Sequence, residues 1–186
     1  MELNRLLLFT AFLLHIKSSR MSPTGLVCDR RLIQKYIAEA TDLEEQMRRC
    51  EELPLLNEPV QLPLVGFNLR DWIRKTNQAK GQEVLHNLGK LVEGTAAVQN
   101  ELRQGCAVAP LQQLYERAST FLLHLRNFRG QEEGGGEQPE GASRVTPERN
   151  PKRIFQTYTQ LVRGKLHFLF QDLWRDSCSR EAPGDA

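Results

Sequence analysis

The sequence predicts an all-α protein that folds as a four-helix bundle with up-up-down-down topology. In four long segments apolar residues recur at three- and four-residue steps, which is the pattern of amphipathic helices. The connections between these segments are long, short and long. An up-down-up-down bundle needs only short connections, so the two long ones favour the up-up-down-down order. At 186 residues and 40 % hydrophobic content, the chain can bury one core of ordinary size.

Residues 1–21 have the pattern of a secretory signal peptide. Arg5 precedes an apolar run over residues 6–16, which is shorter than the roughly 20 residues that a membrane-spanning helix needs. We therefore expect residues 22–186 to form a single domain that is secreted into the extracellular space, with no membrane partner.

The balance of charge argues against binding to nucleic acid. The whole chain has a net charge of +2, but residues 1–21 carry three basic residues and one acidic residue. The remainder holds 22 basic and 22 acidic residues and is therefore neutral. Proteins that bind nucleic acid or anionic membranes need an excess of Lys and Arg, and this domain has none.

The first helix is expected at about residues 29–49, with Asp29 as its N-cap. Residues 51–68 follow as a long crossover, because Pro54, Pro59 and Pro63 exclude a continuous helix. This segment is too apolar for a solvated linker, so we expect it to be extended and packed along the core.

The middle helices are expected at about residues 69–103 and 109–129. Three glycines in the first of them weaken its continuity and predict a kink or break near residues 78–82. A short connection at Gln104–Cys106 joins the two helices and makes them antiparallel neighbours.

The last helix is expected at about residues 150–174, after a mobile loop at residues 130–149 that is rich in Gly and Glu. Gly164 lies in the middle of this helix, where glycine costs about 1 kcal/mol relative to alanine. We interpret it as a point where another group approaches the backbone closely.

Four cysteines, at positions 28, 50, 106 and 178, indicate two disulfides in a secreted chain. Spacing alone leaves three connectivities open. Neither a Cys-x-x-Cys motif nor a histidine at zinc-finger spacing is present, so no metal site is expected from these residues.

Motifs for catalysis are missing as well. A di-iron bundle needs Glu-x-x-His on two helices, and only Glu83 and His86 form such a pair. No nucleophile elbow, phosphate-binding loop or His-Glu-x-x-His motif occurs. We therefore expect neither enzymatic activity nor a metal or cofactor. A secreted bundle that carries an apolar ligand remains an alternative, although the large aromatic side chains of the helices suffice to fill the core.

The N-terminal half resembles the erythropoietin/thrombopoietin family. Pro23 is followed after four residues by Cys28–Asp29, then by Arg31-Leu32-Ile33 and Lys35, and Cys50 comes after fourteen further residues. The segment Arg163-Gly164-Lys165 is similar to part of the family's last helix. Residues 58–63, followed by Phe67, Leu69 and Trp72, are closer to the thrombopoietin branch, as is the position of Cys106.

This resemblance implies a long-chain helical cytokine in which Cys28 pairs with Cys178 and Cys50 with Cys106. It also implies a monomeric haematopoietic hormone that dimerises two copies of a class I cytokine receptor and so activates Janus kinases. The thrombopoietin receptor, with megakaryocyte and platelet production, is the expected target. The erythropoietin receptor is the alternative within the family.

Two receptor-binding faces follow from the resemblance. The tighter face would contain residues of the last helix and of the first crossover: Pro63, Phe67, Asp71, Arg163, Lys165 and Phe168. The weaker face would contain Asp29, Arg31 and Lys35 with exposed residues of the helix at 109–129. Arg163 and Lys165 would pair with acidic receptor residues, and Phe168 would be an apolar anchor.

Overall fold

A computed structural model describes residues 28–66, 68–129 and 144–178. The predicted signal peptide, Phe67 and most of the predicted mobile loop lie outside the described residues. The described chain forms helices α3 (Arg30–Arg48), α4 (Leu69–Arg74), α5 (Asn77–Glu101) and α6 (Val108–Arg129), then a last helix made of α7 (Lys152–Leu161), the π-helical turn η1 (Val162–Leu166) and α8 (His167–Ser177). Two short strands, β1 (Val60–Pro63) and β2 (Val145–Glu148), complete it.

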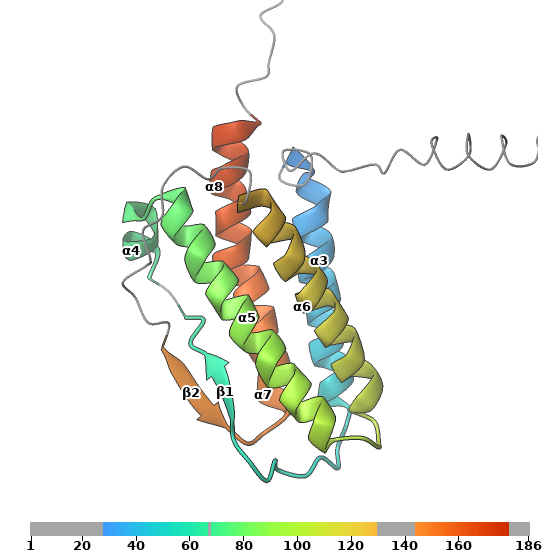
Figure 1. The fold of residues 1–186 in the computed structure, drawn as a ribbon. Helices are drawn as coiled ribbons and strands as arrows, with labels where there is room; N and C mark the ends of the chain where they lie inside the picture. Colours follow the sequence, from blue (N-terminus) through green and yellow to red (C-terminus); the bar gives the residue numbers. More distant parts are fainter. Residues whose placement is uncertain (1–27, 67, 130–143, 179–186) are drawn as a thin grey trace, which may run out of the picture.

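The helices form the predicted up-up-down-down bundle. In Figure 1, α3 and α5 both descend, whereas α6 and the last helix both ascend. The four largest fully buried side chains come from α4, α6 and α7: Trp72, Tyr158, Phe121 and Phe155. Tyr36 of α3 stacks on Phe121 with ring centroids 4.3 Å apart. Bulky aromatic groups thus fill the centre of the bundle.

The two crossovers pair with each other, which the sequence did not predict. β1 and β2 are antiparallel, with Val60 opposite Glu148 and Pro63 opposite Val145. The prediction of a mobile loop to residue 149 was therefore wrong for residues 145–148, because their backbone groups bond to the first crossover. The crossover itself is extended, as predicted, and its strand lies against α5. A Cβ atom at Gly94 of α5 would be 3.2 Å from the side chain of Leu62, so glycine allows this close packing.

The predicted helix at 69–103 is divided. It breaks at Lys75 and Thr76, a few residues before the expected place, and the Thr76 hydroxyl accepts a hydrogen bond from the Ala79 N–H at 3.2 Å. The glycines at 81, 89 and 94 lie within the continuous helix α5. A side-chain cap, not a glycine, therefore sets the break.

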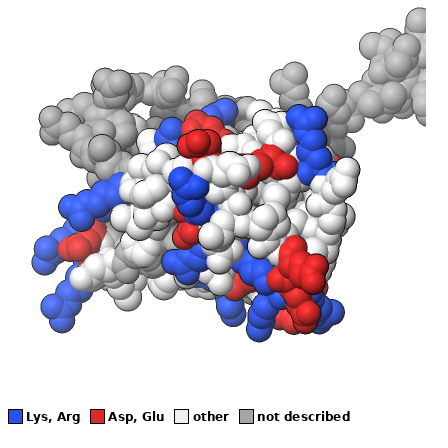
Figure 2. Space-filling view, turned by 90° about the horizontal axis from the view of Figure 1, so that it is seen from below, with Lys and Arg blue, Asp and Glu red and all other residues white. Residues whose placement is uncertain are grey.

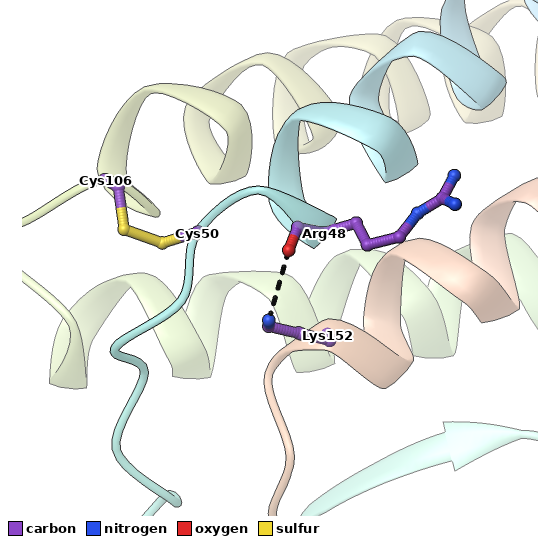
Figure 3. Close-up of a disulfide and its surroundings, with 4 residues drawn as sticks. All are labelled: Arg48, Cys50, Cys106 and Lys152. Atoms are coloured by element: carbon purple, nitrogen blue, oxygen red, sulfur yellow. Dashed lines mark hydrogen bonds between the residues drawn. A yellow bond between two sulfur atoms is a disulfide. The ribbon is translucent and has the colours of Figure 1, made fainter.

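Both predicted disulfides are confirmed, Cys28–Cys178 and Cys50–Cys106. Figure 3 shows the second one beside the end of α3, where the Lys152 ammonium donates to the Arg48 carbonyl at 3.4 Å. The start of the last helix is thus tied to the end of the first. Nearby, the short connection between α5 and α6 turns at Gly105, whose φ of 95° favours glycine.

Charges of both signs are interspersed on the end of the molecule that Figure 2 shows. This mixture agrees with the neutral composition of residues 22–186. None of the helices in the described ranges combines the length and apolar character of a membrane span.

Replacing the disulfide cysteines in pairs tests the stabilisation that the loops imply. Loop-closure entropy predicts a loss of about 4 kcal/mol in the free energy of unfolding for Cys50→Ser with Cys106→Ser, and about 5 kcal/mol for Cys28→Ser with Cys178→Ser, because the second loop is longer. Urea unfolding followed by circular dichroism measures both. A loss below about 1 kcal/mol in either variant would contradict this account.

Candidate functional site

The first crossover is fixed to the last helix by a buried lysine. Lys165 lies in η1 and is 3 % exposed. Its ammonium nitrogen is 2.8 Å from the Glu83 carboxylate of α5 and donates to the Leu64 carbonyl of the crossover at 3.3 Å. One side chain therefore joins three segments that are far apart in the sequence.

The helix widens where this lysine sits. Gly164 has φ −97° and ψ −108°, outside helical values, and η1 has π-helical hydrogen bonding. The predicted helix at 150–174 is therefore interrupted by one wide turn at Gly164. A π-turn inserts a residue into a helix and shifts the direction of the side chains that follow it.

Glu83 is shared between two lysines. Besides Lys165 it pairs with Lys75, at the end of α4. Burial would raise the pKa of Glu83, but the hydrogen bonds and positive charges of Lys165 and Lys75 outweigh it and hold the pKa below its ordinary value. Since Glu83 is paired in this way and His86 is exposed, the Glu-x-x-His motif does not present a metal site.

A second buried charge pair joins α5 to α8, and its carboxylate also holds α4. The Lys80 ammonium, whose side chain is 7 % exposed, lies 2.8 Å from the Asp172 carboxylate. The same carboxylate accepts a hydrogen bond from the Trp72 indole N–H at 3.3 Å. Trp72 fills the core below α4, so the short helix is held both by packing and by the hydrogen bond to Asp172.

The structure brings together the two segments that carry the tighter predicted face, but not every side chain is available. Asp71 and Arg163 are exposed, and Arg163 forms no ion pair with any described residue. Pro63 is buried in β1, Phe168 is partly buried, and Phe67 lies outside the described residues. The sequence interpretation had Lys165 pair directly with receptor acids, which requires an exposed ammonium group. That interpretation was wrong about the exposure of Lys165, because its ammonium faces Glu83 within the protein.

Exposed apolar side chains on this surface were missed. Leu64 and Leu69 are each 47 % exposed, and Ile73 is 68 % exposed. Apolar character alone would place Leu64 and Ile73 in the core. In a separate helix of six residues only Trp72 turns inward, and this leaves Ile73 in solvent. The caps Asn68 and Thr76 were the sequence signals that α4 is a separate helix.

The residues of the weaker predicted face cluster at the start of α3. The Asp29 carboxylate caps the helix by accepting from the Arg31 N–H at 3.0 Å. Arg31 is almost fully exposed, and the exposed Lys35 lies 3.9 Å from Glu39. Glu39 also pairs with Arg117 of α6 at 3.4 Å, so this face includes α6.

No cluster of three or more His, Cys, Asp or Glu side chains suited to a metal ion occurs within residues 28–66, 68–129 and 144–178. Tyr36 and Tyr158 lie in the aromatic core, where burial raises the pKa of both phenols. Neither tyrosine is therefore suited to donate or accept protons near neutral pH.

Comparison with known proteins identifies the family. Residues 25–181 match the family model described as Erythropoietin/thrombopoietin. The chain is 33 % identical to thrombopoietin of Rattus norvegicus over 91 % of its length and 30 % identical to thrombopoietin of Canis lupus familiaris over 98 %. In both cases the match covers 50 % of the relative, so the chain spans about half the length of these curated relatives.

Erythropoietins match as well. The chain is 31 % identical to erythropoietin of Tetraodon nigroviridis, with 87 % of this chain and 92 % of the relative covered. The rodent and dog thrombopoietins cover a larger share of this chain, which agrees with the predicted nearness to the thrombopoietin branch.

The variant Glu83→Gln tests the buried charge network. It leaves the Lys165 ammonium buried without a carboxylate, so we expect the free energy of unfolding to fall by about 3 kcal/mol at pH 7. The lowered pKa means that Glu83 stabilises the folded state fully above the unfolded carboxyl pKa of about 4.3. That stabilisation is lost as the pH falls through the folded pKa, so the two proteins should converge in acid.

Urea unfolding at pH 7 and at pH 3 measures this difference. Glu93→Gln is the matched control, because Glu93 is 67 % exposed in its pair with Lys90 and should contribute below about 0.5 kcal/mol. Equal losses for the two variants at pH 7 would show that the buried network adds no stability.

Proposed function

Because the chain belongs to the erythropoietin/thrombopoietin family, whose members are cytokine ligands and not enzymes, we propose that it is a secreted haematopoietic cytokine. It would bind two copies of a class I cytokine receptor through two faces and thereby activate the associated Janus kinases. The thrombopoietin receptor is the preferred target, and megakaryocyte and platelet production the expected response. The observation that carries the proposal is the surface formed by the crossover and the last helix around Lys165.

This surface has the composition of a protein-protein interface. The exposed apolar side chains of Leu64, Leu69 and Ile73 lie on the crossover and α4. Arg70, Asp71 and Arg74 are exposed on the same short helix. Interfaces commonly combine an apolar centre with a polar rim, and unpaired arginines such as Arg163 are frequent anchors. We assign the tighter receptor contact to this surface, with Phe67 and Phe168 as further apolar candidates.

Lys165 and Pro63 would act on the receptor indirectly. Both are buried, so we propose that they hold the crossover against the last helix and do not touch the receptor. A surface that is already fixed before binding loses less conformational freedom on association, which favours affinity.

The second receptor would bind at Asp29, Arg31 and Lys35 of α3, together with α6. In Figure 1 the start of α3 lies on a different side of the bundle from α4 and the strands. Two separate faces allow one monomeric ligand to bridge two receptor chains. The contacts at this face are exposed and charged, so each should contribute little individually.

Two alternative functions remain, and a survival assay with receptor-expressing cells distinguishes them. The chain could act on the erythropoietin receptor, given its identity to erythropoietins, or it could carry an apolar ligand without signalling. Factor-dependent cells that express one of the two receptors, from a matched species, should survive with the purified protein only when they carry the thrombopoietin receptor. Survival only with the erythropoietin receptor would reverse the specificity, and no response in either line would contradict the cytokine function.

Arg163→Glu should lower affinity for the receptor ectodomain by about tenfold or more, because it reverses an exposed, unpaired charge at the proposed interface. The free energy of unfolding should stay within about 0.5 kcal/mol of that of the unchanged protein. Arg103→Glu, an equal charge change at an exposed residue just beyond the end of α5, is the control and should bind normally. Surface plasmon resonance measures both, and equal affinities for the two variants would exclude Arg163 from the interface.

A further inference from the structure

A groove of about 490 Å³ lies between α3 and α8, apart from the residues assigned to either face above. Its floor is apolar: Ile33 and Phe170 are buried, and Trp174 is partly buried against the core. Exposed Arg30 and Arg175 line its edges, so it opens on the surface and is not an internal cavity. Its size and apolar floor suit one or two inserted side chains.

The edges of this α3–α8 groove are positively charged. The Arg30 guanidinium lies 3.5 Å from the centroid of the Trp174 ring, and no described carboxylate pairs with it. Arg175 is 3.6 Å from the Asp172 carboxylate, which already pairs with Lys80 at 2.8 Å. Two cations therefore share one anion, and none of the lining residues is acidic.

Polar groups that can direct a ligand are also present. His167 and Gln171 lie 3.1 Å apart, nitrogen to nitrogen, on the α8 side, and Gln34 lines the α3 side. Together with the arginines they surround the apolar floor with hydrogen-bonding groups. An apolar floor enclosed by cationic and amide groups is complementary to an apolar side chain that has a carboxylate beside it.

We propose that the α3–α8 groove binds a segment of the receptor that presents an apolar side chain flanked by an Asp or Glu. This inference rests on the proposed function, since it assumes that the partner is a class I cytokine receptor. The apolar side chain packs on Ile33, Phe170 and Trp174, and the carboxylate pairs with the Arg30 guanidinium. Contact with the Trp174 ring holds that guanidinium in place, which reduces the entropy lost on binding.

The position of the groove connects the two proposed faces. On α3, Arg30 and Gln34 alternate with Arg31 and Lys35 of the weaker face. On the last helix, His167 follows four residues after Arg163 of the tighter face. The groove therefore supplies an apolar contact next to exposed charges that contribute little alone.

Two variants of the full chain test the proposal against the receptor ectodomain that binds the unchanged protein. Arg30→Glu reverses the charge at the first residue of α3, where an acidic side chain suits the helix N-terminus and the fold should persist. Gln171→Trp fills the groove from an exposed position. Each should accelerate dissociation about tenfold in surface plasmon resonance, whereas Arg103→Glu should stay within about twofold.

The outcomes separate this inference from the proposed function. If both variants dissociate at the rate of the unchanged protein while Arg163→Glu weakens binding, the groove proposal is wrong and the receptor function stands. If the unchanged protein binds neither the thrombopoietin nor the erythropoietin receptor ectodomain, the groove proposal and the proposed function are both wrong. Circular dichroism of each variant establishes that a loss of binding does not reflect unfolding.

Photo-crosslinking identifies the occupant of the groove. A benzoylphenylalanine at position 34, at the edge of the groove, should crosslink to the receptor chain in the complex. A crosslink only to residues 179–186 of this chain, or only to a second copy, would overturn the proposal.

Discussion

The buried pair between Lys165 and Glu83 is the interaction on which the proposed surface depends. A four-helix bundle alone does not specify where a long crossover lies, because the crossover contributes few of the contacts between helices. Here the Lys165 ammonium bonds to the Leu64 carbonyl while its charge is balanced by Glu83 of α5. Burying this charge costs free energy that good geometry and several bonds must offset. The buried pair thereby fixes the crossover in one position.

Other features hold the same crossover along its length. The ribbon of β1 and β2 satisfies its backbone groups, Gly94 lets Leu62 approach α5, and the Cys50–Cys106 disulfide fixes its beginning. At its far end, Asp172 holds α4 through Trp72 and pairs with Lys80 of α5. The apolar residues Leu69 and Ile73 can therefore stay exposed in a defined geometry, as a binding surface requires.

Local patterns in the sequence were sufficient for the bundle, and the family resemblance for the disulfide pairing, but neither was sufficient for the details of the site. Helical periodicity gave the long helices because it depends only on neighbours three and four residues apart. The pairing of β1 with β2 joins residues more than eighty positions apart, and no local signal specifies it. The burial of Lys165 likewise depends on Glu83, 82 positions earlier, so a motif on the last helix could not reveal it. The π-turn had one visible sign, Gly164, which we interpreted as a close approach.

Hydrogen exchange of Lys165→Met, compared with the unchanged protein, tests most directly whether this lysine fixes the crossover. Methionine keeps a similar length and an apolar character but cannot bond to Leu64 or pair with Glu83. We predict faster exchange of backbone amides in residues 60–74. Protection in α6 should be unchanged, because neither the bond of Lys165 to Leu64 nor its pair with Glu83 involves α6. Unchanged protection across residues 60–74 would contradict it, because the crossover would then be held without the buried charge.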